Sequence, residues 1–176
     1  MKRLLVGMCL MSLIFTNHLP IFDLNTALAA APGSVVINEV AWAGTADSST
    51  DEWIELYNTT SSPIDLTGWT IVDDNGDAVY VIASGMVAGN GYFLIEDSEE
   101  TTSIPANAVI NISLANTGDS LVLKDNLGAV IDTVNSTGGM WFAGNSTTKT
   151  TMERIDPLSD GDTVANWGAN LLSSGA

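Results

Sequence analysis

Carboxylates are the reactive side chains that this chain offers in number. Its 176 residues include 21 aspartates and glutamates against five lysines and arginines, with one cysteine and one histidine. Calcium takes about six to eight oxygen ligands from carboxylates, carbonyls and water. Acidic side chains that could supply them gather in four loops, at residues 47–52, 73–77, 96–100 and 156–162.

The loop at 73–77 is the first candidate for calcium, with Asp73, Asp74, Asn75 and Asp77 as ligands. None of the four loops has the Asp-x-Asp-x-Asp-Gly spacing, with glutamate at the twelfth position, of an EF-hand. Turns also select aspartate, asparagine and glycine for backbone reasons, and an acidic surface keeps a secreted protein soluble. A calcium site and a solubilising turn therefore both stay open, and no other cofactor is expected.

A second group of charged residues comprises Glu39, Glu55 and Arg154. Because a guanidinium can hold a carboxylate through two hydrogen bonds, we expect Arg154 to bridge Glu39 or Glu55 if their strands adjoin. The three residues would then be structural ties. The alternative is a carboxylate-only hydrolase, whose two carboxyl groups would lie roughly 5–9 Å apart across an open cleft. The structural interpretation is favoured, and no enzymatic activity is expected.

Aromatic residues in loops are the candidates for binding. Trp42 borders a glycine-containing loop, and Trp141 and Phe142 follow two consecutive glycines in the longest late loop. An exposed loop aromatic can stack on a sugar ring or anchor a protein contact. Packing onto the edge of the core is the more common role for such residues. If any surface binds a partner, we expect it at Trp141, Phe142 and Trp42.

The first 29 residues have the layout of a secretory signal peptide. Lys2 and Arg3 precede an apolar run at 4–15, and alanines occupy positions −3 and −1 of a cleavage site after Ala29. An uncleaved membrane anchor is the alternative, but a span needs about 20 apolar residues and polar residues interrupt this run from Asn17. The sequence therefore predicts an exported protein without a transmembrane segment after cleavage.

Cleavage would remove the cysteine and the histidine and leave 20 acidic and three basic side chains. Without cysteine or histidine, the mature chain has no disulfide, no Ser-His-Asp or Cys-His mechanism and no zinc site built on those residues. Since binding to phosphate backbones depends on lysine and arginine, no nucleic-acid partner is expected.

Short apolar or alternating runs separated by turn residues follow from residue 35 onward. Asn-Gly at 75–76 and the turn at 125–128 are typical of hairpins. The pattern predicts an all-β sandwich or barrel of about nine short strands. The expected strands are 35–42, 53–58, 69–73, 78–82, 92–96, 109–112, 120–124, 129–134 and 151–156.

The order of several short sequence motifs resembles the lamin tail domain family, above all its bacterial exported members. The motifs are INEV (37–40), EWIELYN (52–58), IDLTGW (64–69), GYFLI (91–95), the run at 118–123, GAVID (128–132), TMER (151–154) and NW (166–167). The resemblance implies an immunoglobulin-like β-sandwich that acts as a non-catalytic module.

The expected organisation is a signal peptide at 1–29, a short linker at 30–34, the lamin-tail-type domain at 35–172 and a flexible tail at 173–176. The nuclear role of lamins, which includes chromatin, does not carry over to an exported acidic chain. We expect a secreted binding or attachment module for a protein or a cell-surface or glycan partner. A calcium-stabilised adhesion module is the alternative.

Overall fold

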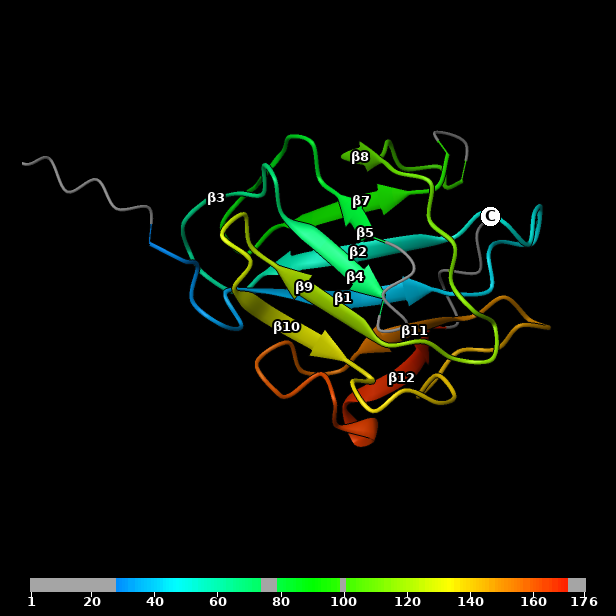
Figure 1. Ribbon diagram of the computed structural model, residues 1–176. Helices are drawn as coiled ribbons and strands as arrows, with labels where there is room; N and C mark the ends of the chain where they lie inside the picture. The colour runs from blue at the N-terminus through cyan, green and yellow to red at the C-terminus, as the bar shows by residue number, and fades with distance from the viewer. Residues whose placement is uncertain (1–27, 74–78, 99–100, 171–176) are drawn as a thin grey trace, which may run out of the picture.

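A computed structural model describes residues 28–73, 79–98 and 101–170 of the chain. Two large sheets form the fold (Figure 1): six strands in the order β12-β11-β1-β2-β7-β8 and four in the order β10-β9-β4-β5, with a small pair β3-β6. The strands are β1 (Val35–Ala41), β2 (Trp53–Asn58), β3 (Ile64–Asp65), β4 (Thr70–Asp73), β5 (Val79–Val81), β6 (Met86–Val87), β7 (Tyr92–Glu96), β8 (Ala108–Val109), β9 (Leu121–Lys124), β10 (Val130–Val134), β11 (Thr151–Arg154) and β12 (Trp167–Asn170). A single 3-10 turn, η1 (Val164–Asn166), precedes β12 within the described residues.

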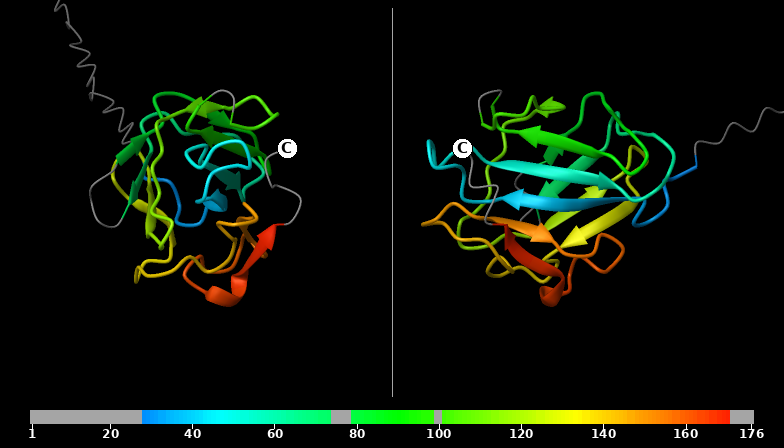
Figure 2. Two further views of the ribbon diagram at one scale, coloured as in Figure 1. Left: turned by 90° about the vertical axis from the view of Figure 1, so that its right-hand side faces the viewer. Right: turned by 180° about the vertical axis from the view of Figure 1, so that it is seen from behind.

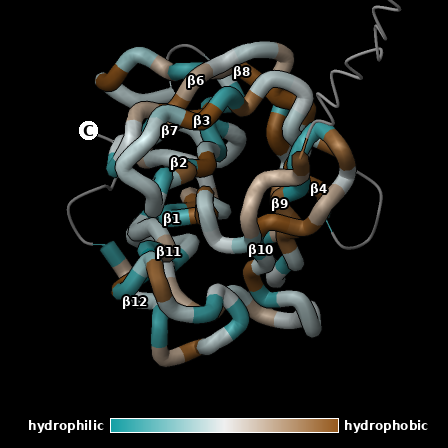
Figure 3. The backbone as a smooth tube through the Cα atoms, turned by 90° about the vertical axis from the view of Figure 1, so that its left-hand side faces the viewer, coloured by the Kyte–Doolittle hydropathy of each residue, from teal (hydrophilic) through white to brown (hydrophobic). Residues whose placement is uncertain are grey.

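One hydrophobic core lies between the two large sheets, which stand as separate layers in Figures 2 and 3. β2 illustrates the pattern, because Ile54 and Leu56 are fully buried in the core while Glu55 points to the other face. Ile71 of β4 and Leu123 of β9 are equally buried on the facing sheet. Each such side chain contributes about 1.5–3 kcal/mol. The predicted immunoglobulin-like all-β sandwich is confirmed.

The described residues contain twelve strands, whereas the sequence predicted nine. Eight of the nine expected runs correspond to β1, β2, β4, β5, β7, β9, β10 and β11. The run expected at 109–112 overlaps β8 only at Val109, and the sequence reasoning missed β3, β6 and β12. β3 and β6 have only two residues each, too few for a periodic pattern. β12 contains Gly168 and Ala169 between Trp167 and Asn170, so it has no run of strand-forming residues. It pairs in register with β11 along its four residues.

The turn at 125–128 forms the expected hairpin between β9 and β10. Asp125 accepts the backbone N–H groups of Leu127 and Ala129, and Gly128 has a φ of 82° that favours glycine. β4 and β5 also pair antiparallel, although residues 74–78 between them lie outside the described part.

A register shift in β1 decides which side chains face the core. Ile37 pairs with Leu56 and Glu39 pairs with Glu55, so Asn38 is an extra residue between them. Glu39 therefore turns to the outer face of the sheet.

The predicted signal peptide lies outside the described residues up to position 27, as does the predicted tail. Residues 30–34, expected as a linker, are hydrogen-bonded to the sandwich, for example from Gly33 N to Ile131 O at 2.7 Å. No helix within the described ranges is long and apolar enough to cross a membrane.

Candidate functional site

A groove at one end of the sandwich brings together two of the three predicted binding residues. It has a volume of about 640 Å³, and three segments far apart in sequence form it: the end of β1, the segment before β9 and the loop before β11. We call it the aromatic groove. Its lining residues are Trp42, Asn116, Thr117, Met140, Trp141, Ala143, Gly144, Asn145 and Ser146.

Two parallel indole rings form the fixed part of this groove. The rings of Trp42 and Trp141 have centroids 6.1 Å apart and an interplanar angle of 10°. Trp42 Nε1 donates to Ala143 O at 3.0 Å, and Trp141 Nε1 donates to Ala115 O at 2.8 Å. Both side chains belong to the core cluster, with 7% and 8% exposure, and Phe142 packs partly buried against that cluster without lining the groove. The loop thus folds onto the sandwich edge.

The rim of the aromatic groove is polar and uncharged. Asn116, Thr117 and Ser146 are exposed, and their side chains make no hydrogen bond within the described residues. Met140 is 82% exposed. None of the nine lining residues, all of them described, carries a charge, so the groove lacks the paired carboxyl groups that a carboxylate hydrolase needs.

An irregular segment at 111–115, which we call the strap, crosses the end of the sandwich beside this groove. Side chains from separate parts of the chain accept hydrogen bonds from four successive backbone N–H groups of the strap. The hydrogen bonds run from Ile112 N to Asp97 Oδ1 at 2.9 Å, from Ser113 N to Tyr80 Oη at 3.1 Å, from Leu114 N to Glu52 Oε2 at 2.8 Å and from Ala115 N to Asp119 Oδ2 at 3.4 Å.

Glu52 is the most perturbed acid of this group. Burial raises its pKa from 4.5 to about 7, against the lowering effect of the Leu114 N–H. The negative charges of Asp97 and Asp119 raise the pKa further, and Lys149 lowers it. Sequence reasoning placed Glu52 in an acidic loop and missed its contact with a residue 62 positions away, for which no local pattern exists.

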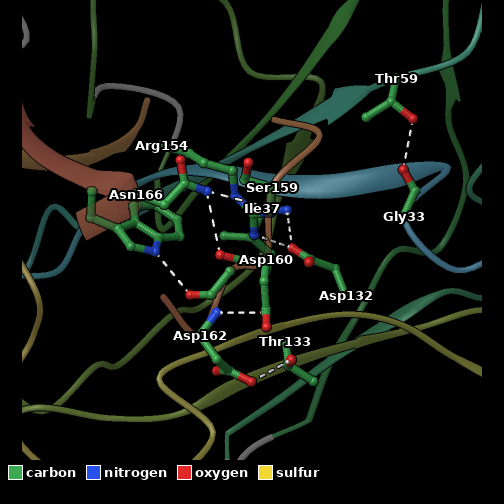
Figure 4. A network of polar contacts seen from close by, with 12 residues as sticks. Gly33, Ile37, Thr59, Asp132, Thr133, Arg154, Ser159, Asp160, Asp162 and Asn166 are labelled. Carbon is green, nitrogen blue, oxygen red and sulfur yellow. Dashed lines mark hydrogen bonds and ion pairs between the residues drawn. The ribbon is translucent and has the colours of Figure 1, made fainter. Parts of the chain in front are cut away.

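Arg154 joins the two sheets (Figure 4). Its Nη2 atom lies 2.5 Å from Asp132 Oδ2, and Nη1 donates to Ser159 O at 3.2 Å. The guanidinium lies 5.1 Å from the ring centre of Trp167. Ile37 N also donates to Asp132 Oδ2, at 2.8 Å. Burial raises the pKa of Asp132 to about 6, although Arg154 lowers it.

The prediction that Arg154 bridges Glu39 or Glu55 is therefore wrong. Arg154 is two residues from the core residue Met152 on β11 and shares its side of the sheet, whereas the extra residue Asn38 turns Glu39 to the opposite face. Sequence reasoning missed Asp132 as the partner, because nothing in its local pattern separates it from other strand aspartates.

Other polar groups hold the two outer glutamates. Asn38 Nδ2 donates to Glu55 Oε1 at 3.0 Å, while Thr151 Oγ1 and Asn170 Nδ2 donate to Glu39 Oε1. Burial raises the pKa of Glu55 to about 7, and the negative charge of Glu39 adds to the rise. These residues thus connect β12, β11, β1 and β2 on the outer face, without the arginine.

The calcium loop is only partly described. Asp74, Asn75 and Asp77 lie outside the described residues. Asp73 is 6% exposed and pairs in register with the core residue Leu121. Within the described part of the chain, no group of three or more acidic, histidine or cysteine side chains could hold a metal ion. Calcium binding stays a prediction.

Comparison with protein-family models matches residues 29–138 to the Lamin Tail Domain, which is more than half of the chain. The chain belongs to the lamin tail domain family. This confirms the resemblance seen in the sequence motifs. Lamin tail domains are immunoglobulin-like modules that are typically non-catalytic and mediate interactions. The match covers β1 to β10, while Arg154 and Met140 to Ser146 of the groove lie beyond it. No curated protein matches the chain.

Proposed function

We propose that this lamin tail domain is an exported, non-catalytic binding module that recognises a neutral glycan of a cell surface through the aromatic groove. The observation that carries the proposal is the uncharged lining of that groove in a chain with 21 acidic residues. Its volume of about 640 Å³ is in the range of small-ligand sites.

The groups that line the groove fit a ligand rich in hydroxyl groups. Asn116, Thr117 and Ser146 have hydrogen-bonding capacity that the described residues do not use. Sugars combine hydroxyl groups with apolar C–H faces, and the exposed Met140 and the edges of the two indoles offer apolar contact to those faces. A cationic ligand would find no counter-charge in the lining, and the acidic surface would repel an anionic one.

Binding can be measured through the tryptophans themselves. Neutral linear hexasaccharides of glucose and of N-acetylglucosamine are titrated into the protein, and we expect a saturable change in tryptophan emission. Asn116→Ala and Met140→Ala should weaken binding at least about fivefold, since each removes an exposed groove contact. Met86→Ala is the matched control, because Met86 is 64% exposed on β6 and does not line the groove.

Two results would contradict this proposal. If neither saccharide binds, the assignment of a neutral glycan as the ligand is wrong. Equal weakening by Met86→Ala and Met140→Ala would move the binding surface away from the groove.

Export is the second part of the proposal. The cationic start at Lys2 and Arg3, the apolar run at 4–15 and the alanines before position 30 support it. The full chain is expressed in a bacterial host, and the culture medium and periplasm are analysed by mass spectrometry. We expect a product that begins at Ala30, and retention of the intact 176-residue chain in the cell would contradict export.

A further inference from the structure

Asp125 divides its two carboxylate oxygens between two distant parts of the chain. It is 3% exposed at the start of the β9–β10 turn. Oδ1 accepts the N–H groups of Leu127 at 2.9 Å and Ala129 at 2.8 Å, which stabilises the turn. Oδ2 accepts the N–H of Ala30 at 2.9 Å, although Ala30 is 95 residues away.

The sandwich holds the Ala30 nitrogen in place. Ala30 is partly buried against the core cluster. Three residues further on, Gly33 N donates to Ile131 O at 2.7 Å, and the Thr59 hydroxyl donates to Gly33 O at 2.6 Å. The segment that carries Ala30 is therefore bonded to the start of β10 and to the end of β2.

We propose that Asp125 is the receptor for the α-ammonium group that signal-peptide cleavage creates at Ala30. The inference rests on the proposed export. Hydrolysis breaks the Ala29–Ala30 peptide bond with one water molecule, whose hydroxyl group goes to the carbonyl carbon of Ala29. The Ala30 nitrogen takes the remaining hydrogen of that water and leaves as an amine, which then gains the proton that the new Ala29 carboxyl group releases. It therefore has three donors and a positive charge where it had one neutral donor.

Charge complementarity makes this contact stronger after cleavage. Before cleavage a neutral amide N–H faces the carboxylate at 2.9 Å, whereas after cleavage both groups carry charge and a direct Coulombic attraction is added. Burial alone raises the pKa of Asp125, but the backbone N–H groups of Ala129, Ala30 and Leu127 outweigh it and hold the pKa below its ordinary value. Asp125 is therefore ionised at neutral pH. The groups that shift this pKa are backbone amides, with no charged side chain among them in the described residues.

Only one cleavage position places the new charge on the atom that Asp125 binds. Cleavage after Ala27 would leave two residues before Ala30, whose nitrogen would stay an amide. Cleavage after Ala31 would remove Ala30 altogether. The geometry of the folded domain and the small-residue pattern of the leader thus favour the same bond.

The test is the proton affinity of the α-amino group in residues 30–176, which contain all twelve strands. NMR titration of the chain with Ala30 as its first residue should give an α-amino pKa above about 9, at least tenfold tighter than the ordinary value near 8. Asp125→Asn should return it to about 8, because the amide keeps the turn acceptor but loses the charge.

Two further variants control for folding and for general electrostatics. A single glycine placed before Ala30 moves the ammonium by one residue, leaves Asp125 intact and should also return the pKa to about 8. Asp65→Asn is the matched control substitution. Asp65 accepts the N–H of Thr67 at 2.9 Å in a similar turn, but it is exposed and does not bind the Ala30 nitrogen. It should leave the raised pKa unchanged.

The two levels of the inference fail in different ways. An α-amino pKa near 8 in the chain that begins at Ala30 overturns the pairing with Asp125, even if export is correct. A secreted product that begins at any other residue overturns the processing step, even if the pKa is raised in the prepared chain. A raised pKa together with a secreted product that begins at Ala30 supports both.

Discussion

Replacing Asp132 with asparagine tests how the two sheets are held together at the β10–β11 side. The substitution keeps an oxygen that can accept the Ile37 N–H, now 2.8 Å from Oδ2. It removes the negative charge that lies 2.5 Å from Arg154. Because Ile37 N and Arg154 Nη2 both bond Oδ2, the asparagine oxygen can still accept from both. The buried guanidinium then has only neutral hydrogen-bond acceptors in the described residues, which are this amide oxygen and Ser159 O.

The size of the effect follows from burial. The Arg154 side chain is 1% exposed and that of Asp132 is 9% exposed, so neither charge is compensated by water. Breaking such a pair by removing one partner costs about 3–5 kcal/mol. Since a domain of this size is stable by about 5–15 kcal/mol, the variant should lose a large share of its stability. The measurement belongs at about pH 7.5, where Asp132, with its pKa raised to about 6, is ionised.

The assay is urea denaturation of wild type, Asp132→Asn, Arg154→Met and the double variant. We expect unchanged m-values and a lower midpoint for each single variant. The double variant should be more stable than Asp132→Asn alone, because it no longer buries an unpaired charge. This comparison separates the ion pair from the packing of the arginine on Trp167.

A loss below about 1 kcal/mol in Asp132→Asn would refute this reasoning, since it would mean that Arg154 reaches water or another acceptor. Additive losses in the double variant would refute it as well, because residues that interact directly do not behave additively.

Three further predictions concern other parts of the domain. Because the folded-state pKa values of Glu52 and Glu55 are raised from 4.5 to about 7, the folded state binds these protons more tightly than the unfolded state does. The free energy of unfolding should therefore rise as pH falls from about 8 to about 5. We expect about 1 kcal/mol from each glutamate, since both are partly solvated. In urea denaturation at several pH values, Glu52→Gln should make this pH dependence weaker. Asn58→Ala should lower the free energy of unfolding by about 2–4 kcal/mol in urea denaturation. Asn58 is fully buried, and its amide donates to Ser62 O at 2.8 Å and Ala88 O at 3.0 Å. As a control, Asn116→Ala at an exposed position should change stability by less than about 0.5 kcal/mol. Because Asp73 is 6% exposed and pairs with the core residue Leu121, we expect millimolar calcium to change the melting temperature by less than about 2 °C relative to chelator. A rise of about 10 °C would instead support a metal site at loop 73–77.

Local sequence determined the elements of this domain. Alternation in residues 53–58 and 121–124 places Ile54, Leu56 and Leu123 in the core, since strand side chains repeat every second residue. Asp125 and Gly128 are chemically suited to the turn that they form. The ordered sequence motifs between residues 37 and 167 also identified the family. These features depend on neighbours a few positions apart, which a sequence displays directly.

The tertiary structure alone decided which distant side chains meet. The extra residue Asn38 reverses the facing of Glu39, so the expected partner of Arg154 lies on the wrong side of the sheet and Asp132 takes its place. Glu52 accepts a hydrogen bond from Leu114 of the strap, 62 positions away. β12 is a strand because its backbone pairs with β11. These outcomes depend on register and on the packing of one sheet against the other, which no local pattern encodes.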